Sequence, residues 1–563
     1  MESLCWSYRF RVLARENCFN PCKNAVLSNL GAPICLNYHC SNSRTSGSSV
    51  VRSTARDLAV LESPTAKEVL IPFPGSASQP FPHLRLENDH LWSALEIAEA
   101  VDGEIVRWGP SGTITTDTRK LMPGQWFFAI AGKNFDGHDF VTQELADKGC
   151  VGVIGNRICK HWHGGFIKVE GDTLFGLEKM ARYARNRFHG VVVGLTGSVG
   201  KTTTRTMIAL ALESLGRVYQ THGNLNYMVG VALTLTGIPM DAKASVVELG
   251  MGGKEGEILV MARMCQPSVR VILNVGHGHM EHFRSLKEVA KAKGEIMTEA
   301  KPGDICVLNA DDPLVMSIPV PVGVKKVLFG RKIGCDVRLV LAESIDGGCA
   351  VRVILESKIG TYHKLFSFPS EKTSEMVEFK IHGPGLHLAM DACAAAAVAV
   401  LLGVRLPQIG EALSRFRPVH MRSEMEITKH GIKIINDTYN ANLASMMAAI
   451  KLLKSMDCEG KRVAILGDML ELGAAEAGAH ELALKLCFDA CIALVMLAGK
   501  RFTAAAEKLN FLGNSNFLCA RDSASLVPRI AEMLTTGDVV LVKGSRGMQM
   551  EKVVDTIKMM DGR

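Results

Sequence analysis

The sequence predicts a three-domain α/β protein, and three observations carry that prediction. The chain has 563 residues, more than a single hydrophobic core usually supports. Short apolar runs alternate with helix-length segments, a pattern typical of parallel sheets covered by helices. The alternation restarts near Val191 and again near Arg422. We therefore expect three α/β domains in series.

The domain boundaries follow from where each alternation starts. Residues 1–85 are expected to be a leader and linker, because residues 62–90 contain repeated prolines. Residues 86–188 would form the N-terminal domain, 189–419 the central domain and 420–563 the C-terminal domain. In the N-terminal domain we predict a helix over 91–100 and strands at 126–130, 151–154 and 166–169. In the central domain we predict strands at 191–195, 244–248, 269–274 and 304–309. In the C-terminal domain the predicted strands are 432–436, 462–466, 493–498 and 538–542.

Charge and composition exclude several classes of protein. The formal net charge is +7, but residues 1–60 hold seven Lys or Arg against three Asp or Glu, so the rest is nearly balanced. We therefore expect no nucleic-acid partner. The first 60 residues are basic and poor in acids, with no long apolar segment after the basic residues. This favours an organellar transit peptide over a secretory signal, although an ordinary tail would have a similar composition.

Cysteine usage and hydropathy place further bounds. None of the 16 cysteines forms a Cys-x-x-Cys pair, and five lie in the first 40 residues. This pattern indicates a reducing compartment without structural zinc or a disulfide framework. The longest apolar run, residues 389–404, is alanine-rich and too short for a membrane span. We expect a buried helix there and no membrane span.

A phosphate loop is the strongest single motif. Residues 196–204 read Thr-Gly-Ser-Val-Gly-Lys-Thr-Thr-Thr, after a β-branched run and before a predicted helix. Glycines let the backbone close around an anion, and the helix N-terminus directs N–H groups toward it. Leu195 stands where the first glycine of the general pattern is expected. The predicted triphosphate-binding residues are Thr196, Gly197, Ser198, Val199, Gly200, Lys201, Thr202 and Thr203, of which Thr202 would also bind Mg²⁺.

Further motifs occur in a fixed order between residues 115 and 551. They are Asp-Thr-Arg at 117–119, Asp-Gly-His-Asp at 136–139, Gly-Asn-Leu-Asn at 223–226, Glu-Leu-Gly-Met at 248–251, Asn274 with His279, Ala-Lys-Ala-Lys-Gly-Glu-Ile at 290–296, Asn-Ala-Asp-Asp-Pro at 309–313, Asp-Thr-Tyr-Asn-Ala-Asn at 437–442, Leu-Gly-Asp-Met-Leu-Glu-Leu-Gly at 466–473 and Lys-Gly-Ser-Arg at 543–546. In this order they resemble the Mur ligase family, and the motifs at 437–442 and 466–473 favour its MurF type. The resemblance implies the three-domain Mur ligase architecture, with a central phosphate-loop, parallel-sheet ATPase domain and a Rossmann-like C-terminal domain.

The resemblance also implies a reaction. Mur ligases use ATP to phosphorylate a carboxylate, and an amine then attacks the acyl phosphate to form an amide. The implied cofactors are ATP and Mg²⁺. Glu248 ends an apolar strand, where α/β sheets place ligands, and is expected to bind Mg²⁺. His279 matches a family metal ligand, although it could also belong to a solvated His-rich loop.

Lys293 is the fourth expected catalytic residue, beside Lys201, Glu248 and His279. It falls at helical spacing with Leu286, Val289 and Ala290, on an otherwise apolar face. A lysine there is usually a snorkelling side chain. In Mur ligases the matching lysine is carbamylated and helps to hold Mg²⁺, which suits a buried amine with a lowered pKa. Lys291 is off that face.

The resemblance extends to nucleotide and substrate residues in all three domains. Polar loop positions are the ordinary alternative for each of them. The expected ATP-binding set is completed by Asn309, Asp391, Arg422 and Asp437. The expected substrate-binding residues are Asp117, Thr118 and Arg119 for a UDP-sugar, Asn224 and Asn226 near the nascent bond, and Asn440, Asn442, Lys543 and Arg546 for a dipeptide.

Two positions depart from the family pattern. The family has Gly-x-His-Asn-x-x-Asn before its alanine-rich helix, where an asparagine helps to read adenine. Here Leu388 and Asp391 replace the two asparagines. An ionised aspartate can only accept hydrogen bonds, so the affinity for ATP is in question. Tyr227 also stands where a second asparagine is common.

The leading hypothesis is an ATP-dependent ligase that adds D-alanyl-D-alanine to a UDP-muramyl peptide. A plastid stroma is expected rather than a mitochondrion, because peptidoglycan synthesis fits plastid ancestry, and a monomer is expected. Two alternatives stay open: a related Mur or folylpolyglutamate-type ligase that uses another amine, and a non-catalytic scaffold that kept the fold.

Overall fold

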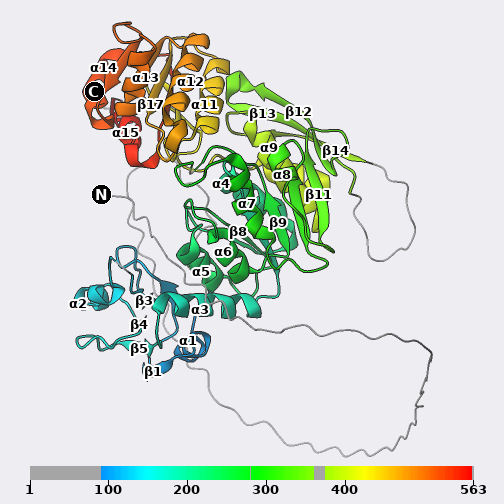
Figure 1. Cartoon of the computed structure of the whole chain (residues 1–563), viewed down its shortest axis with the longest axis vertical. Helices are drawn as coiled ribbons and strands as arrows, with labels where there is room; N and C mark the ends of the chain where they lie inside the picture. The colour runs from blue at the N-terminus through cyan, green and yellow to red at the C-terminus, as the bar shows by residue number, and fades with distance from the viewer. Residues whose placement is uncertain (1–89, 133, 279, 360–373, 561–563) are drawn as a thin grey trace, which may run out of the picture. The chain divides into compact units, whose positions relative to one another are not determined.

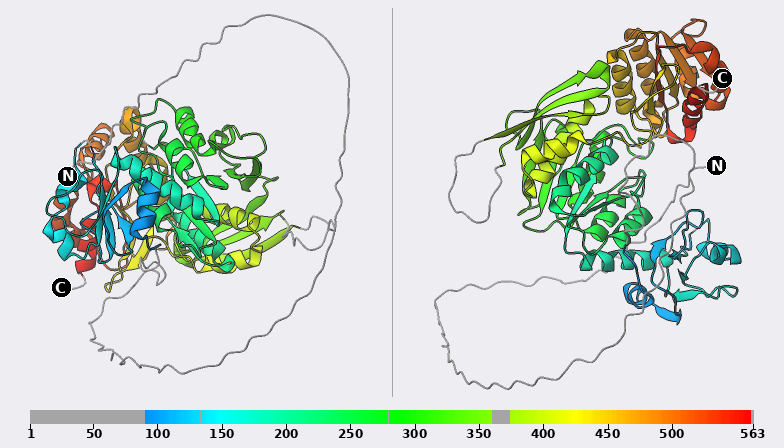
Figure 2. Two further views of the ribbon diagram at one scale, coloured as in Figure 1. Left: turned by 90° about the horizontal axis from the view of Figure 1, so that it is seen from below. Right: turned by 180° about the vertical axis from the view of Figure 1, so that it is seen from behind.

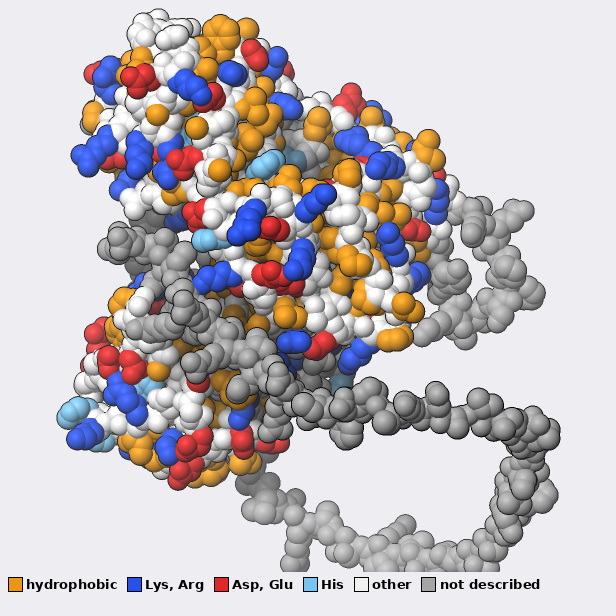
Figure 3. Space-filling model, viewed as in Figure 1, with side chains coloured by type: hydrophobic (Ala, Val, Ile, Leu, Met, Phe, Trp, Pro, Cys, Tyr) orange, Lys and Arg blue, Asp and Glu red, His pale blue; other side chains and the backbone are white. Residues whose placement is uncertain are grey.

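The computed structural model describes residues 90–132, 134–278, 280–359 and 374–560. The predicted leader, residues 1–85, and His279 lie outside the described residues. None of the described helices is long and apolar enough to cross a membrane. The described cysteines are all free thiols. On the face drawn in Figure 3, acidic and basic side chains are interspersed, which fits the balanced charge of this part of the chain.

The N-terminal domain is built on a sheet of five strands among the described residues, in the order β1-β5-β4-β3-β2 (Figure 1). Its elements are α1 (Ala94–Val101), β1 (Glu104–Arg107), β2 (Thr113–Thr115), β3 (Gln125–Phe128), α2 (Gln143–Asp147), β4 (Gly152–Gly155), β5 (Gly165–Lys168) and α3 (Thr173–Arg187). Helix α1 begins where it does because Ser93 and Glu96 form a reciprocal capping box. The four predicted elements are confirmed. The antiparallel strand β1 was not predicted.

The central domain carries the largest sheet, with nine strands within the described ranges, in the order β14-β13-β12-β11-β10-β9-β6-β8-β7. Its strands are β6 (Val191–Thr196), β7 (Val218–Gln220), β8 (Ala244–Glu248), β9 (Val269–Ile272), β10 (Ile305–Asn309), β11 (Lys325–Gly330), β12 (Val337–Ile345), β13 (Ala350–Ser357) and β14 (Glu375–Ile381). Its helices are α4 (Lys201–Leu212), α5 (Met228–Gly237), α6 (Glu257–Cys265), α7 (Leu286–Gly294), α8 (Pro313–Met316), α9 (His387–Leu401) and α10 (Leu406–Ser414). The four predicted strands are confirmed as β6, β8, β9 and β10.

The predicted parallel sheet of the central domain is confirmed, and an antiparallel extension that was not predicted continues it at one edge. Strands β12, β13 and β14 pair antiparallel and extend from that edge (Figures 1 and 2). Burial alternates along β13, as expected for an antiparallel strand with one solvated face. The remaining strands, β6 to β12, pair parallel.

Helices cover both faces of the central sheet. On one face α4, α9 and α10 enclose a core with the sheet residues, and residues 392–399 of α9 are completely buried. The predicted buried helix is thereby confirmed. On the other face α5, α6 and α7 share one continuous core with α1 and α3 of the N-terminal domain. Trp92 supports this junction, because its indole N–H donates to the Thr236 carbonyl at 2.8 Å.

The C-terminal domain has a six-stranded sheet among its described residues, in the order β15-β16-β20-β17-β18-β19. Its elements are β15 (Glu424–Ile427), β16 (Lys433–Asp437), α11 (Leu443–Ser455), β17 (Arg462–Gly467), α12 (Glu476–Asp489), β18 (Leu494–Ala498), α13 (Lys500–Lys508), β19 (Phe517–Ala520), α14 (Ser523–Met533), β20 (Val539–Lys543) and α15 (Glu551–Met559). All pairs except β15 with β16 are parallel, and a separate core lies on each face. The four predicted strands are confirmed.

Candidate active site

The phosphate loop joins the end of β6 to the start of α4. Gly200 has φ +82°, a left-handed conformation that glycine adopts without strain. The side-chain oxygen of Asn274, which follows β9, accepts hydrogen bonds from the backbone N–H groups of Ser198 and Val199 at 3.0 and 2.9 Å. The Asn274 amide in turn donates to the Val199 carbonyl at 3.0 Å. Asn274 thus shapes the loop, a role that the sequence motif alone did not reveal.

Lys201 and Thr202 open α4 and point to two different partners. The Lys201 ammonium donates to the Gly197 carbonyl at 3.0 Å and so folds back across the loop. The Thr202 hydroxyl donates to Oε2 of Glu248 at 3.0 Å. Because these contacts are short and local, the loop brings a cation, a hydroxyl and a carboxylate together beside a helix N-terminus. This is the arrangement that a bound phosphate and metal require.

Glu248 is the centre of this cluster. It ends β8, as the sequence predicted, and is only 1% exposed. Besides Thr202, its carboxylate accepts hydrogen bonds from Arg205 at 3.1 Å and from Asn226 at 2.8 Å. Burial of a carboxylate is costly unless such partners replace the water that it loses. Asn226, expected to bind substrate, therefore holds the expected metal ligand in this structure.

Arg205 is a site residue that the sequence reasoning missed. It is 5% exposed and also donates to the Gln220 side chain at 3.2 Å and to the Gly223 carbonyl at 3.1 Å. Its signal was present in the sequence, because Arg205 follows Lys201 by four residues. Two like charges at that spacing repel each other unless an anion lies between them.

Lys293 is buried on the inner face of α7, as its helical spacing predicted. It is 3% exposed, and burial followed by the positive charge of Lys201 holds its pKa well below the ordinary value. Lys291 is exposed and pairs with Glu255. The lysine that the pattern selected is therefore the buried one, and the charge of Lys201 in the phosphate loop acts on it.

Asp391 lies against the phosphate loop. Its Oδ1 accepts a hydrogen bond from the Thr204 hydroxyl at 3.0 Å, and a Cβ added to Gly200 would lie 2.6 Å from the same oxygen. Burial raises the pKa of this carboxyl to about 7. Leu388 belongs to α9, is 3% exposed and packs in the core. Base reading by Asp391 stays a prediction, but its contact with the loop is a structural fact.

The other predicted residues of the central domain differ in how far they are exposed to solvent. Asn309, at the end of β10, donates to the Leu273 carbonyl at 2.9 Å and is 8% exposed. Thr196 is buried, Thr203 is half-buried and Asn224 is exposed. None of these positions by itself decides a contact with ATP or substrate.

In the C-terminal domain the predicted residues bind one another. Lys543 is 1% exposed, and its ammonium donates to Asp437 at 2.7 Å and to the Asn440 carbonyl at 2.9 Å. Asn442 caps α11 through a capping box with Ser445. In this structure the Lys543 ammonium binds residues of its own domain, and its expected contact with a dipeptide stays a prediction. Lys543 fixes the loop that carries Asn440.

The two arginines of this domain differ from each other. Arg422 is half-buried, and its charge acts on Lys201 in the phosphate loop. Burial lowers the pKa of Lys201, the Glu248 carboxylate raises it, and the positive charge of Arg422 lowers it. Arg546 has 57% of its side chain exposed and pairs with Glu551 at 3.4 Å. The structure thus brings Arg422, but not Arg546, within electrostatic reach of Lys201.

The predicted UDP-sugar residues of the N-terminal domain lie in an exposed turn after β2. Arg119 donates two hydrogen bonds to Asp117, each at 2.8 Å, and its side chain is 85% exposed. This local pair lowers the pKa of Asp117, chiefly through the hydrogen bond from Arg119. Thr118 lies between them and is half-buried. The turn presents these groups to solvent, and the sugar contact stays a prediction.

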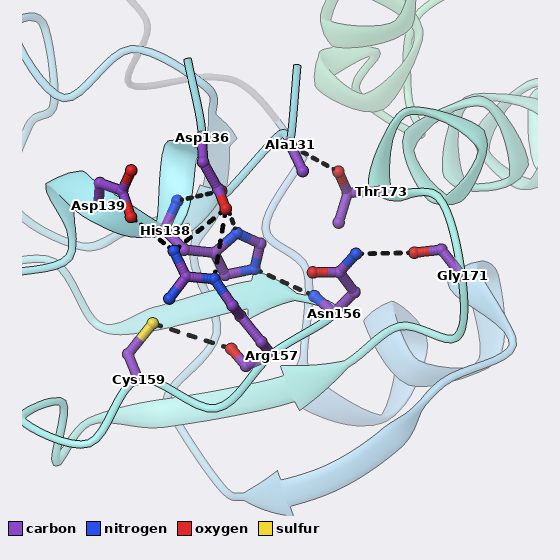
Figure 4. A network of polar contacts seen from close by, with 9 residues as sticks. All are labelled: Ala131, Asp136, His138, Asp139, Asn156, Arg157, Cys159, Gly171 and Thr173. Atoms are coloured by element: carbon purple, nitrogen blue, oxygen red, sulfur yellow. Dashed lines mark hydrogen bonds and ion pairs between the residues drawn. The ribbon is translucent and has the colours of Figure 1, made fainter. Parts of the chain in front are cut away.

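The members of a second polar cluster in this domain bind one another (Figure 4). The buried His138 ring lies 2.5 Å from Asp136 through Nδ1, and its Nε2 accepts the backbone N–H of Asn156 at 3.1 Å. Arg157 donates to Asp136 at 3.1 Å and to Asp139 at 2.5 Å. Both ring nitrogens are satisfied, so His138 is a structural residue.

The donor set at the phosphate loop fits a magnesium ion. Mg²⁺ binds oxygen and usually takes one or two carboxylates together with substrate phosphates. Glu248 and Thr202 supply a carboxylate and a hydroxyl that already contact each other at 3.0 Å. Within the described ranges, no group of three His, Cys, Asp or Glu side chains could hold a metal alone. The carboxylate and the hydroxyl thus supply part of an oxygen coordination sphere of the kind that Mg²⁺ completes with water and substrate phosphates.

The fold and this site define a phosphate-loop α/β protein with three domains. Three family models match the chain: the Mur ligase family catalytic domain at residues 112–159, the Mur ligase middle domain at 195–399 and the Mur ligase glutamate ligase domain at 421–546. The chain belongs to the Mur ligase family.

Individual relatives agree with this assignment. The UDP-N-acetylmuramoyl-tripeptide–D-alanyl-D-alanine ligase of Bacillus subtilis (strain 168) is 32% identical over 464 residues, which cover 81% of this chain and 96% of the relative. A crystal structure of MurF from Acinetobacter baumannii superposes with a TM-score of 0.72 at 26% identity, covering 84% of this chain and 99% of that one. MurF ligase from Thermotoga maritima, solved in complex with ADP, gives 0.66 at 26% identity, covering 80% and 98%.

Proposed function

We propose that this protein is an ATP-dependent ligase that joins D-alanyl-D-alanine to a UDP-N-acetylmuramoyl-tripeptide, a step of peptidoglycan precursor synthesis. One observation carries the proposal: Lys201 and Arg205 share a single strand-end carboxylate, Glu248, at a phosphate loop, and a third cation, Arg422, acts on both. Such an excess of cations suits a polyanionic ligand. The names of the relatives supply the substrates.

The proposed reaction has two steps. A carboxylate of the tripeptide takes the γ-phosphoryl group of ATP and ADP leaves. The dipeptide amine then attacks the acyl phosphate, an amide forms and phosphate leaves. Lys201 and the N–H groups of the loop bind the transferred phosphate, and Arg422 faces them from the C-terminal domain. The chain therefore works mainly by positioning and by charge.

Thr202, Glu248 and His279 are proposed to hold Mg²⁺, with Lys293 as a carbamate. The ion would neutralise the part of the negative charge on the phosphate oxygens that the lysines do not balance. The observation in favour is the burial of Lys293, which lowers the pKa of its amine and so favours the neutral form that reacts with CO₂. Arg205 and Asn226 would keep the Glu248 carboxylate in place.

Substrate contacts are proposed at two ends of the site. The exposed turn with Asp117, Thr118 and Arg119 would bind the UDP-sugar, and Asn440 and Arg546 would bind the dipeptide. Asn224 would lie near the new bond. These positions rest on the family motifs and on exposure of the groups to solvent.

Phosphate release tests the proposal. Purified full-length protein with MgATP should release phosphate only when both the UDP-muramyl tripeptide and D-alanyl-D-alanine are present. Release that depends on neither peptide would contradict the ligase assignment. Release with a different amine, followed as ADP formation, would instead favour a related Mur or folylpolyglutamate-type ligase.

Complementation separates an enzyme from a scaffold. The wild-type chain should restore growth of a bacterial strain that lacks this ligase, whereas Lys201→Ala should not. Growth with both would mean that phosphate binding at the loop is dispensable, and growth with neither would favour a non-catalytic scaffold.

We also propose that the protein works as a monomer in the plastid stroma, with a transit peptide and a linker in residues 1–85. The support is the basic, acid-poor composition of the first 60 residues. A fluorescent protein fused to residues 1–85 should enter plastids. Gel filtration should give a mass near that of one chain.

A further inference from the structure

The stack of Arg422 on Tyr439 has no role in the function described so far. The guanidinium carbon of Arg422 lies 4.0 Å from the centre of the Tyr439 ring. Tyr439 lies within the motif 437–442, in which Asp437, Asn440 and Asn442 were expected to act and Tyr439 was not. At that distance a guanidinium is attracted by the ring face, and the attraction grows when both groups are partly desolvated. Both residues are half-buried.

The backbone around Arg422 is strained. Met421 and Ser423, on either side of it, have φ +62° and +51°, which non-glycine residues rarely adopt. Both are 8% exposed, and each is held by the Tyr439 loop. The Tyr439 N–H donates to the Met421 carbonyl at 3.1 Å, and the Ser423 N–H donates to Asp437 at 3.1 Å. The strain persists because the loop fixes the segment at two points.

The buried Lys543 anchors the loop that carries Tyr439. Asp437 accepts from the buried Lys543 ammonium at 2.7 Å, and the same ammonium binds the Asn440 carbonyl at 2.9 Å. Lys543 is 1% exposed. Lys543 therefore binds the loop on both sides of Tyr439 in the sequence. The Tyr439 ring can thus act as a fixed surface for Arg422.

The stacked arginine faces other cations. The charge of Arg422 acts on both Lys201 and Arg205, and Tyr439 acts on Arg205. Like charges repel, so an unsupported Arg422 would turn toward solvent. The ring and the strained backbone oppose this rotation. The result is a third cation held near the phosphate loop.

We propose that Tyr439 is a positioning residue whose ring holds Arg422 toward the phosphate loop, so that the triphosphate meets a preformed third cation. This inference rests on the proposed function, because the ligand is taken to be MgATP. Preorganised charge binds an anion without the cost of ordering a flexible side chain. The aromatic face, and not the hydroxyl, carries the effect.

The test is titration calorimetry of MgATP into the full-length chain and four variants. Tyr439→Leu removes the ring and should weaken binding by about 2- to 30-fold, the range expected for one cation–π contact. Tyr439→Phe keeps the ring and should bind within about twofold of wild type. Arg422→Gln should lose at least as much as Tyr439→Leu. In the Arg422→Gln background, Tyr439→Leu should add no further loss.

A matched control is available in the N-terminal domain. Tyr183 also lies near an arginine, with Arg187 at 5.7 Å from its ring centre. Tyr183→Leu should leave MgATP affinity unchanged. In steady-state assays, Tyr439→Leu should raise KM for ATP more than it lowers kcat.

The outcomes are distinguishable. Unchanged affinity in Tyr439→Leu, equal losses in the Phe and Leu variants, or additive losses in the double variant would each overturn the positioning role while leaving the proposed function intact. A wild-type chain that binds no MgATP would overturn both. Normal melting of Arg422→Gln, whose ring and loop are unaltered, keeps the test valid if Tyr439→Leu fails to fold.

Discussion

The phosphate-loop site and the His138 cluster each contain a buried ionisable side chain, Lys293 in the first and His138 in the second, but they differ in how their charges are satisfied. In the His138 cluster each ring nitrogen and each carboxylate has a partner within the domain. At the phosphate loop, Lys293 is buried, and the charged neighbour that acts on it is another cation, Lys201. A satisfied network stabilises a fold, whereas an excess of one charge favours a ligand of the opposite charge.

The largest effect should come from Lys201. Lys201→Met removes the 3.0 Å hydrogen bond from the Lys201 ammonium to the Gly197 carbonyl, which crosses the loop. It also removes the positive charge that would face a bound phosphate. We expect ligase turnover to fall about 10³-fold, as for loss of a preorganised donor to a developing charge. Folding should be little affected, because a largely desolvated cation is removed. Turnover within tenfold of wild type in the phosphate-release assay would contradict the assigned role.

Substitution of Lys293 should reduce ligase turnover nearly as much. Lys293→Met keeps the volume of the side chain but cannot form a carbamate, and turnover should fall about 10²-fold. Added bicarbonate should raise the turnover of wild type and leave that of the variant unchanged. The matched control is Lys291→Met, on the same helix but exposed and paired with Glu255, which should behave as wild type. Equal behaviour of the two variants would refute the distinction between the two lysines.

The His138 cluster should respond in the opposite way. His138→Ala leaves Asp136 and the Asn156 N–H without a buried partner and opens a cavity, since the His138 side chain is fully buried. The free energy of unfolding should fall by about 2–4 kcal/mol, read from urea denaturation. The affinity for MgATP should not change. A loss of affinity without a loss of stability would mean that this cluster is not merely structural.

Asp391 should give the smallest effect, and one that depends on pH. Its folded-state pKa of about 7 lies above the ordinary value of 3.8. Between about pH 4 and 7 the unfolded chain has lost this proton while the folded chain keeps it, so the free energy of unfolding decreases as pH rises through that window. Asp391→Asn should remove this decrease and be more stable than wild type at pH 8.

The same substitution should alter nucleotide affinity. Above pH 7 the carboxylate is ionised against the phosphate loop and repels the triphosphate. Asp391→Asn should therefore bind MgATP about three- to tenfold more tightly at pH 8, with little change at pH 6. An equal effect at both pH values would show that charge is not the cause.

Sequence reasoning succeeded where the signal is local. The phosphate loop, the end of β8 at Glu248 and the inner face of α7 at Lys293 depend on neighbouring residues, and each lies where its pattern predicted. The antiparallel edge β12–β14 was missed although part of its signal is local, because Asp-Gly-Gly at 346–348 marks the turn that joins β12 to β13 in a hairpin. The pairing of β13 with β14 joins segments that lie further apart in the sequence.

The roles of individual side chains were harder to predict. Lys543 carries the same charge as Lys201 and also follows a strand, yet it is buried against Asp437. Arg205 was overlooked although it holds Glu248. Whether a charged residue faces a ligand or another residue depends on tertiary contacts, and a single sequence does not contain them.

The central claim is that a nucleotide triphosphate binds at the start of α4 beside Glu248. The most direct measurement is calorimetric titration of MgATP into the intact, folded chain, with Lys201→Met as reference. The account predicts saturable heat at one site per chain in wild type and a large loss in the variant. No heat and no saturable signal from the wild-type protein would contradict it.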